Sequence, residues 1–409
     1  MSQYKMQGNI YKFNLKESFN KLRSYCEKEG YKGWDPYDGL NSKVFKATPL
    51  KHWDLARLIW IQSFKRNPFN LRKLLLVPKE YNSMGIGLFL NGYIQLYKIC
   101  LTGNIEFGTL EDLKDKIVEL AELLIQLKSP NQKHSCWGYN FDWQARRLFL
   151  FPAYTPTVVA TTFCASALFE AYAVIKEEKF LNEALSACEF VKNDLNRTPH
   201  KGGVIISYSP LNGNNTVFNA SLLGAKLLSY GYHYSKNIEY KDLARKAVVS
   251  AINSQNKNGS WVYGLLPVQN WIDSFHTGFN LEALYYYQKF TSDDAFKENI
   301  KKGYDFYLAN FFLENGIPKY YHNQIFPIDI HCPGQFLVTV SIFDEFNQCN
   351  ELTQKVIAWT IENMQDEKGF FYYQIKKSLS SKISYMRWSN AFMFNALAIY
   401  LNFSQKSNE

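Results

Sequence analysis

One pattern recurs along the chain with a period of 58 residues, and this recurrence limits the possible folds more than any other feature of the sequence. Ala167, Ala225 and Ala283 stand at the same place in three successive copies, each 58 positions from the next. Each copy holds a glycine with aromatic neighbours, a polar segment, a nearly continuous apolar stretch and an amphipathic stretch. A fixed period of this length indicates a repeated supersecondary unit.

Each unit is predicted to contain two helices. In the amphipathic stretch 178–195, Leu181, Leu185 and Cys188 recur at helical spacing with lysines and glutamates between them, which indicates an outer helix with one buried face. The apolar stretch of a unit, such as 392–400, is apolar nearly all round, as is typical of a buried inner helix. The outer helices are expected at about 51–66, 109–128, 178–195, 238–254, 292–313 and 351–365.

The helix tally predicts an all-α fold, an (α/α)6 toroid of six inner and six outer helices. The first inner helix is expected at 84–101, and an extra N-terminal helix at about 13–29 lies outside the count. No linker rich in Pro, Gly or Ser interrupts the repeat, so we expect one domain over 1–409. Its expected parts are an N-terminal helix and mouth-covering loop in 1–50, the toroid in 51–403 and a tail in 404–409.

Aromatic residues make up 17% of the chain, and many precede the inner helices instead of lying within them. At the mouth of a helical barrel, aromatic faces suit stacking on the apolar C–H faces of sugar rings; alternatively, they pack the loops together. The aromatic side chains predicted to contact a substrate are Trp34, Trp137, Trp143, Tyr208, Trp261, Tyr263, Trp271, Tyr321 and Trp388.

Asp273 and His276 are the foremost catalytic candidates, because they share one edge at the start of a predicted helix. A carboxylate beside an imidazole can hold its tautomer and make an acid–base couple. Alternatively, Asp273 caps the helix and His276 is a buried donor to the neighbouring repeat. Asp329 and His331 recur at the corresponding place in the next unit, which favours a functional role for both pairs.

Other polar candidates lie in the loops. Asp142 stands between two aromatic residues, where an apolar environment would raise its pKa, or where an ion pair with Arg146 or Arg147 would fix the loop. Asp35 and Asp38 belong to a loop over the mouth or act as turn formers. Arg387 is a candidate fork for a carboxylate or phosphate, and we expect the Trp34–Asn41 loop to cover it. Further side chains predicted to bind substrate are Asn140, Gln144, Gln335 and Asn390.

The whole chain resembles the six-hairpin (α/α)6-toroid glycosidase-like superfamily. Within that group, the runs 33–42, 137–147 and 273–284 resemble uncharacterised proteins of bacterial capsule and exopolysaccharide biosynthesis clusters. The superfamily includes unsaturated glucuronyl hydrolases, polysaccharide lyases, uronyl C5-epimerases and N-acylglucosamine 2-epimerases. The resemblance implies a carbohydrate-active enzyme that acts on an acidic glycan or glycan precursor in surface polysaccharide biosynthesis.

Three functions remain open from the residues. Glycoside hydrolysis is favoured, with Asp142 and Asp273 as the paired carboxylates and Asp329 as a third candidate. The alternative is C5 epimerisation or β-elimination of a uronic acid, with His276, His331 or a tyrosine as the base and Arg387 on the sugar carboxylate. The third is a non-catalytic glycan-binding or scaffold protein of the polysaccharide machinery.

Charge and cysteine usage limit the partners. The net charge of +9 favours an anionic partner or serves solubility, and no basic run or nucleic-acid motif occurs, so we expect no nucleic acid. The expected partner is an oligosaccharide or a nucleotide-linked or lipid-linked sugar. No signal segment and no membrane span are predicted. The seven scattered cysteines indicate reduced thiols in the cytoplasm, and neither a metal site nor a cofactor is predicted.

Overall fold

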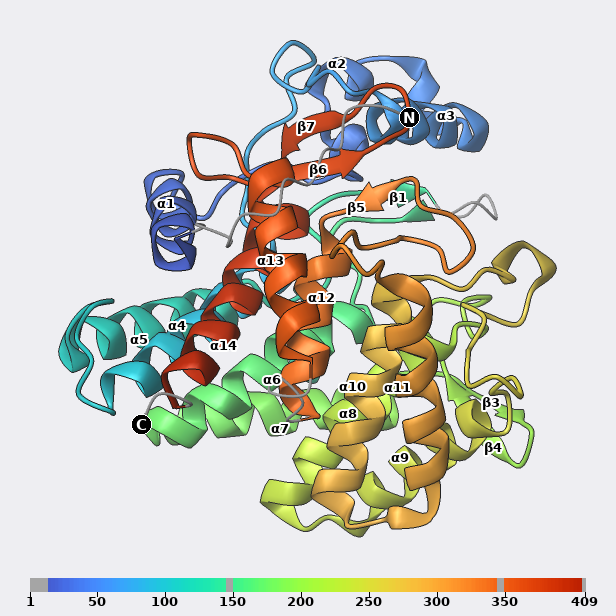
Figure 1. Ribbon diagram of the computed structural model, residues 1–409. Helices are drawn as coiled ribbons and strands as arrows, with labels where there is room; N and C mark the ends of the chain where they lie inside the picture. Colours follow the sequence, from blue (N-terminus) through green and yellow to red (C-terminus); the bar gives the residue numbers. More distant parts are fainter. Residues whose placement is uncertain (1–13, 145–149, 344–348, 407–409) are drawn as a thin grey trace.

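A computed structural model describes residues 14–144, 150–343 and 349–406. Six inner helices form its centre, and each packs against the next around a ring that α14 closes by packing against α4 (Figure 1). Their flanks are buried on nearly every side, which explains why these segments lack a polar face in the sequence. The inner helices are α4 (Ser83–Cys100), α6 (Val158–Ile175), α8 (Phe218–Ser235), α10 (Ser274–Thr291), α12 (His331–Ile342) and α14 (Phe392–Lys406).

Five of the predicted outer helices occupy outer positions around this ring. They are α5 (Leu110–Gln126), α7 (Glu178–Asn193), α9 (Ile238–Ile252), α11 (Lys297–Phe311) and α13 (Asn350–Met364). Each has one buried apolar face and one solvated face, as the helical spacing predicted. The predicted (α/α)6 toroid is therefore confirmed.

The sixth outer helix is not the predicted one. It is α1 (Leu15–Lys28), the helix that was expected to lie outside the count, and it packs against α14. A Cβ on Gly369 would lie 2.2 Å from the carbonyl oxygen of Lys21 in α1, and Gly259 and Gly316 make the same close approach to α11 and α13. In these repeats the glycine thus lies against the next outer helix, and for the last repeat that helix is α1.

The predicted outer helix at 51–66 forms, as α3 (Asp54–Arg66), but it lies outside the ring. It packs mainly against η1 (Asp38–Asn41), η2 (Pro49–His52) and β1, and short α2 (Lys43–Lys46) precedes it. Figure 1 shows α2 and α3 at the upper edge of the molecule. The expected division at residue 50 is therefore wrong, because the toroid includes α1 and excludes α3. The last inner helix also extends to Lys406, into the expected tail.

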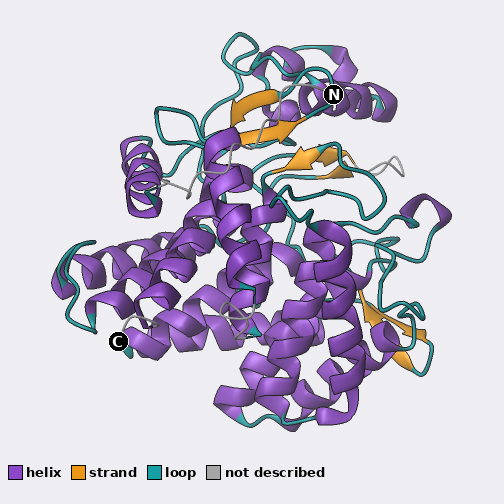
Figure 2. Ribbon diagram, viewed as in Figure 1, coloured by secondary structure: helices purple, strands orange, loops and turns teal. Residues whose placement is uncertain are grey.

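The N-terminal ends of the inner helices gather at one end of the ring. Asn82, Thr157 and Asp273 each cap their helix by accepting a hydrogen bond from the backbone N–H three residues on. Short antiparallel strands lie in the connecting loops (Figure 2). They are β1 (Trp143–Gln144) with β2 (Leu150–Phe151), β3 (Arg197–His200) with β4 (Gly203–Ile206), and β5 (Ile328–Asp329) with β6 (Tyr372–Ile375) and β7 (Ser381–Ser384).

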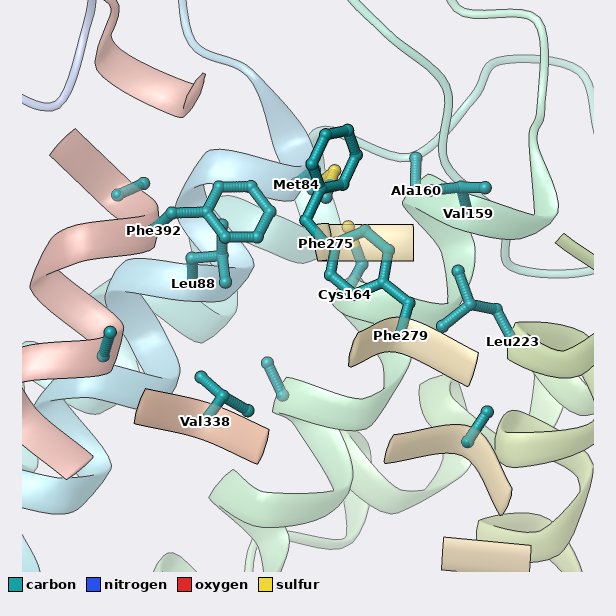
Figure 3. Close-up of a cluster of buried hydrophobic side chains, with 14 of the residues drawn as sticks. Met84, Leu88, Val159, Ala160, Cys164, Leu223, Phe275, Phe279, Val338 and Phe392 are labelled. Carbon is teal, nitrogen blue, oxygen red and sulfur yellow. The ribbon is translucent and has the colours of Figure 1, made fainter. Parts of the chain in front are cut away.

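Apolar side chains fill the centre of the ring. Figure 3 shows this cluster, in which Phe275, Phe279 and Phe392 lie among smaller side chains from the other inner helices. Phe163 packs edge-on against Phe279 and Phe392, with ring centroids 5.4 and 5.8 Å away. A cavity of about 350 Å³ is lined by residues from the N-terminal ends of the inner helices, and a second of about 630 Å³ by residues nearer their C-terminal ends.

One described helix, α6, is long and apolar enough to cross a membrane by length and composition. Within the fold, 67% of that helix is buried. Its apolar character is accounted for by its place in the inner ring, as for the core helix of any large helical domain.

Candidate active site

The cavity of about 350 Å³ at the helix N-termini brings together many of the predicted substrate-binding residues. Trp388 and Arg387 come from η5 (Met386–Ala391), a buried π-helical turn at the start of α14. The predicted site residues that line the cavity are Trp143, Gln144, Tyr208, Tyr263, Trp271, His276, Tyr321, His331, Arg387 and Trp388. Because the inner helices begin at the same end of the ring, residues more than 240 positions apart in sequence meet at this cavity.

Asp273 and His276 form a pair that is fixed from several sides. The Nδ1 of His276 lies 2.8 Å from Oδ2 of Asp273, and a carboxylate can only accept, so Nδ1 carries the proton. Asp273 also accepts from the backbone N–H of His276 at 3.0 Å and from Nε1 of Trp271 at 3.0 Å. Asp273 is therefore both the helix cap and the group that orients the imidazole. The predicted cap is present, and the imidazole donates to Asp273 instead of to the neighbouring repeat, so the lone pair of this tautomer is on Nε2 of His276.

His331 lies in the next repeat, but its surroundings differ. Asp329 stands two positions before it instead of three, and its Oδ1 accepts from the backbone N–H of His331 and from Nε1 of Trp388. The imidazole Nδ1 is buried without a protein partner among the described residues. Burial, Arg387 and His276 lower the pKa of His331 well below its usual value, so the ring is neutral. The second pair thus resembles the first only in sequence.

Phe275 separates the two imidazoles. Its ring centroid is 4.2 Å from that of His276 and 5.0 Å from that of His331. Trp388 packs edge-on against His331 at 4.2 Å. Two imidazole side chains from neighbouring inner helices therefore line one aromatic cavity.

Arg387 is held by the loop that was predicted to cover it. Its Nε donates to Oδ2 of Asp35 at 2.6 Å, and the backbone N–H of Met386 donates to the carbonyl of Trp34. Neither terminal guanidinium nitrogen has an oxygen partner among the described residues, and Nη1 only approaches the sulfur of Met84 at 4.0 Å. Arg387 thus keeps its outer edge for a ligand while Asp35 orients its inner edge.

Three polar atoms on the cavity wall are buried and have no partner among the described residues. They are Nε2 of Gln144, Oδ1 of Asn219 and Nδ1 of His331. Buried polar groups in proteins nearly always have a hydrogen-bond partner, so three such atoms around one cavity indicate a site for a polar ligand. Asn219, at the start of α8, was not among the predicted site residues.

No carboxylate of the described residues lines this cavity. Asp142 accepts from the backbone N–H of Ala153, and its predicted partners Arg146 and Arg147 lie outside the described residues. Asp273 and Asp329 are covered by the groups that they hold. Asp38 forms a buried ion pair with Arg72 at 2.7 Å, and burial raises its pKa to about 6. The paired carboxylates expected for hydrolysis therefore do not meet at the cavity.

Other predicted site residues support the loops instead of facing the cavity. Trp137 and Trp261 are buried and donate from Nε1 to the carbonyls of Leu124 and Ala251, each in an outer helix. Trp34 donates to the carbonyl of Val77, Asn140 accepts from Asn82, and Asn390 accepts from the backbone of Phe371. Gln335 faces the cavity at the other end of the ring, where it donates to Glu282.

Sequence reasoning missed several residues of the cavity wall. Tyr139 stacks on Phe141 at 5.4 Å and its hydroxyl lies 3.1 Å from that of Tyr208, while the guanidinium of Arg387 lies over its ring. Tyr37, in the loop before η1, and Lys65, in α3, also line the cavity, although both come from segments outside the ring. Tyr139 could have been predicted from the sequence, since it directly precedes Asn140 in the same aromatic loop.

Among the described residues, no group of three or more His, Cys, Asp or Glu side chains is arranged as metal ligands. Six of the seven cysteines are buried free thiols.

The comparisons with known proteins concern the fold. No family model matches the chain, and no curated protein shows a significant sequence match. A glycoside hydrolase family 76 α-mannanase of Bacteroides thetaiotaomicron superposes with a TM-score of 0.65 and 12% identity, over 97% of this chain and 98% of that chain. A cellobiose 2-epimerase of Bacillus thermoamylovorans gives a TM-score of 0.62 and 11% identity, over 95% of this chain and 100% of that chain.

A polysaccharide lyase also superposes, with a TM-score of 0.53 and 11% identity, over 80% of this chain and 90% of that chain. The likenesses thus span proteins named as hydrolases, epimerases and lyases. At these identities they establish the architecture, and the chain has the (α/α)6-toroid, glycosidase-like fold.

Proposed function

We propose that this chain is a carbohydrate-active enzyme that moves a proton at a carbon of an acidic sugar, as a uronic acid epimerase or lyase. The observation that carries the proposal is the Asp273-oriented imidazole of His276 in a cavity without a described carboxylate. The fold neighbours named as epimerases and as a polysaccharide lyase support the same class of reaction.

His276 is the proposed base. The hydrogen bond from its Nδ1–H to Asp273 fixes the tautomer and leaves the lone pair of Nε2 for a substrate proton. As the imidazole takes the proton, the positive charge that develops lies beside the Asp273 carboxylate, which stabilises it. The proposal for His276 thus rests on the position and orientation of its imidazole.

Arg387 is the proposed partner of the sugar carboxylate. Loss of the C5 proton sends the bonding electrons into the carboxylate, and a guanidinium stabilises the resulting enolate. A water molecule that gives a proton to the opposite face of C5, and whose hydroxide then takes the proton from His276, completes the epimerisation. Expulsion of the group at C4 gives instead an unsaturated sugar and a shorter glycan. His331, which is neutral and lies across Phe275 from His276, is the group proposed to face the substrate from the second side.

Hydrolysis by paired carboxylates is the less supported candidate, because it needs an acid and a second carboxylate on opposite sides of one bond. The family 76 fold neighbours are the support for it. Aromatic rings such as Trp143, Tyr263 and Trp271 suit a sugar in either reaction. The role in bacterial surface polysaccharide synthesis, and the cytoplasmic location that free thiols favour, are part of the proposal.

The test is incubation of the purified protein in deuterated water with uronic acid oligosaccharides, and with cellobiose as a neutral sugar. Deuterium gained by an oligosaccharide whose elemental composition is otherwise unchanged indicates epimerisation, and a new double bond absorbing in the ultraviolet indicates elimination. A mass gain of one water would replace the proposal with hydrolysis, and tight binding without turnover would replace it with a scaffold role.

The control for this test uses a second Asp–His pair. Nδ1 of His134 also lies 2.8 Å from a carboxylate, that of Asp194, but neither residue lines the cavity. His276→Gln should abolish deuterium uptake or elimination, and His134→Gln should leave both unchanged. Equal loss in the two variants would show that the effect is structural.

A further inference from the structure

Residues 43–76, which lie outside the ring, expose an unusual amount of apolar surface. Of the nineteen large apolar side chains that are exposed in the described part of the chain, nine belong to this segment. Trp53, Phe69 and Leu74 are 63%, 67% and 75% exposed. We call the exposed side chains of residues 43–76 the α3 surface. Concentrated apolar exposure of this kind marks an interaction site.

The same segment carries most of the net positive charge. Residues 43–76 together with the adjoining Lys79 contain nine lysines and arginines and a single acid, Asp54, in a chain whose net charge is +9. Three of these cations have acidic partners: Arg72 pairs with Asp38, Arg57 with Asp54 and Lys79 with Glu29. Five exposed cations have no acidic partner among the described residues: Lys43, Lys46, Lys51, Arg66 and Lys73.

The helix α3 carries part of this surface and also part of the lining of the candidate active site. Leu55 and Ile59 are four residues apart and share its solvent face. Arg57 points away from that face and donates to Gln144 at 2.8 Å, while Gln62 and Lys65, in the next turns of the helix, line the cavity. The α3 surface therefore lies directly beside the mouth, on an element that the ring does not need for closure.

We propose that the α3 surface docks on the surface of an anionic lipid bilayer, with the mouth of the cavity close to the membrane. Exposed Trp, Phe and Leu enter the headgroup boundary, and lysines beside them are attracted to anionic lipids. A second copy of the chain fits less well, because a symmetric contact would bring the unpaired cations of both copies together. The proposal does not depend on which reaction the cavity catalyses. Such a position suits a substrate that is carried on a lipid.

The test is flotation of the full chain with vesicles of equal parts phosphatidylglycerol and phosphatidylcholine, compared with phosphatidylcholine vesicles. Binding should occur on the anionic vesicles and weaken as salt is added, because salt screens exposed charges. The pair Lys43→Glu and Lys46→Glu should lower the partition coefficient by about 30-fold or more, from about 1 kcal/mol for each cation. Trp53→Ser with Ile59→Ser should weaken binding at every salt concentration.

Matched variants far from this segment serve as controls. Leu101→Ser with Ile105→Ser removes two other side chains of comparable exposure, and Lys257→Glu with Lys302→Glu reverses two other exposed cations. Both should float as the unaltered chain does. The proposal fails if the chain does not float, if it floats equally on neutral vesicles, or if the control variants lose binding as strongly. Self-association that Trp53→Ser abolishes, without vesicle binding, would assign the surface to a second copy.

Discussion

Asp273 holds His276 in two ways, since its Oδ1 accepts from the histidine backbone and its Oδ2 lies 2.8 Å from the imidazole Nδ1. One carboxylate therefore fixes both the start of α10 and the tautomer of the base. Asp329 and His331 lack the second of these contacts. The difference favours His276 over His331 as the proposed base, and substitution of Asp273 tests it.

Asp273→Asn should lower kcat by about 10²–10⁴-fold while the protein stays folded. Asparagine caps helices about as well as aspartate, so the loss of stability should be limited to the hydrogen bond from Trp271, about 1 kcal/mol. The amide can present a donor to Nδ1, which favours the wrong tautomer. Steady-state kinetics and thermal unfolding of the same preparation check this. A variant with unaltered kcat would remove the pair from the mechanism.

Arg387→Met should destabilise the fold by about 3–5 kcal/mol, because it leaves the buried carboxylate of Asp35 without its partner. Adding Asp35→Asn to that variant should restore part of the loss. Urea unfolding of the two single variants and the double variant measures the coupling. If the double variant is as unstable as the sum of the single ones, the loop is not fastened through this ion pair.

Gly369→Ala tests whether α1 is the sixth outer helix. The added Cβ would lie 2.2 Å from the carbonyl oxygen of Lys21, so α1 must move, at a cost of about 1–3 kcal/mol beyond backbone strain. Gly103→Ala is the control, because its φ of +93° resembles the +100° of Gly369 but nothing lies within 4 Å of its Cβ. Hydrogen exchange should show lost protection in α1 for Gly369→Ala only. Equal unfolding free energies in the two variants would contradict this packing.

Asp329 should make the protein less stable as pH rises toward neutrality. Burial raises its pKa to about 6 from an ordinary value of 3.8, although Trp388 and Gln374 donate to it. The folded state then binds a proton that the unfolded chain releases, so its stabilising contribution is complete at low pH and is lost as pH rises through about 6.

Asp329→Asn should therefore reduce the change in unfolding free energy between about pH 4 and about pH 6, by roughly 3 kcal/mol at most. Asparagine can still accept from Trp388, and the amide of Gln374 can turn to meet it. Asp242→Asn, at an exposed position, is the control and should leave the slope unchanged. Denaturant unfolding across this pH range measures both. An unaltered slope in Asp329→Asn would show that this carboxyl does not titrate there.

The sequence by itself determined the toroid, since local patterns report burial. The 58-residue period and the change from wholly apolar to amphipathic stretches mark the inner and outer helices. They also place Asp273, His276 and Arg387 at helix starts, where short polar side chains meet unpaired backbone amides. Those properties belong to single segments and can be read without knowing which segments are neighbours.

Only the tertiary structure decided what each segment packs against. Both α1 and α3 show helical periodicity, but α1 packs against α14 and lies close to Gly369, whereas α3 packs against η1 and η2. Likewise, Asp142 and Asp273 look alike as polar residues at the mouth, but each is engaged by groups of the protein and neither lines the cavity. Which side of a loop faces a cavity depends on contacts between repeats, and no single repeat encodes them.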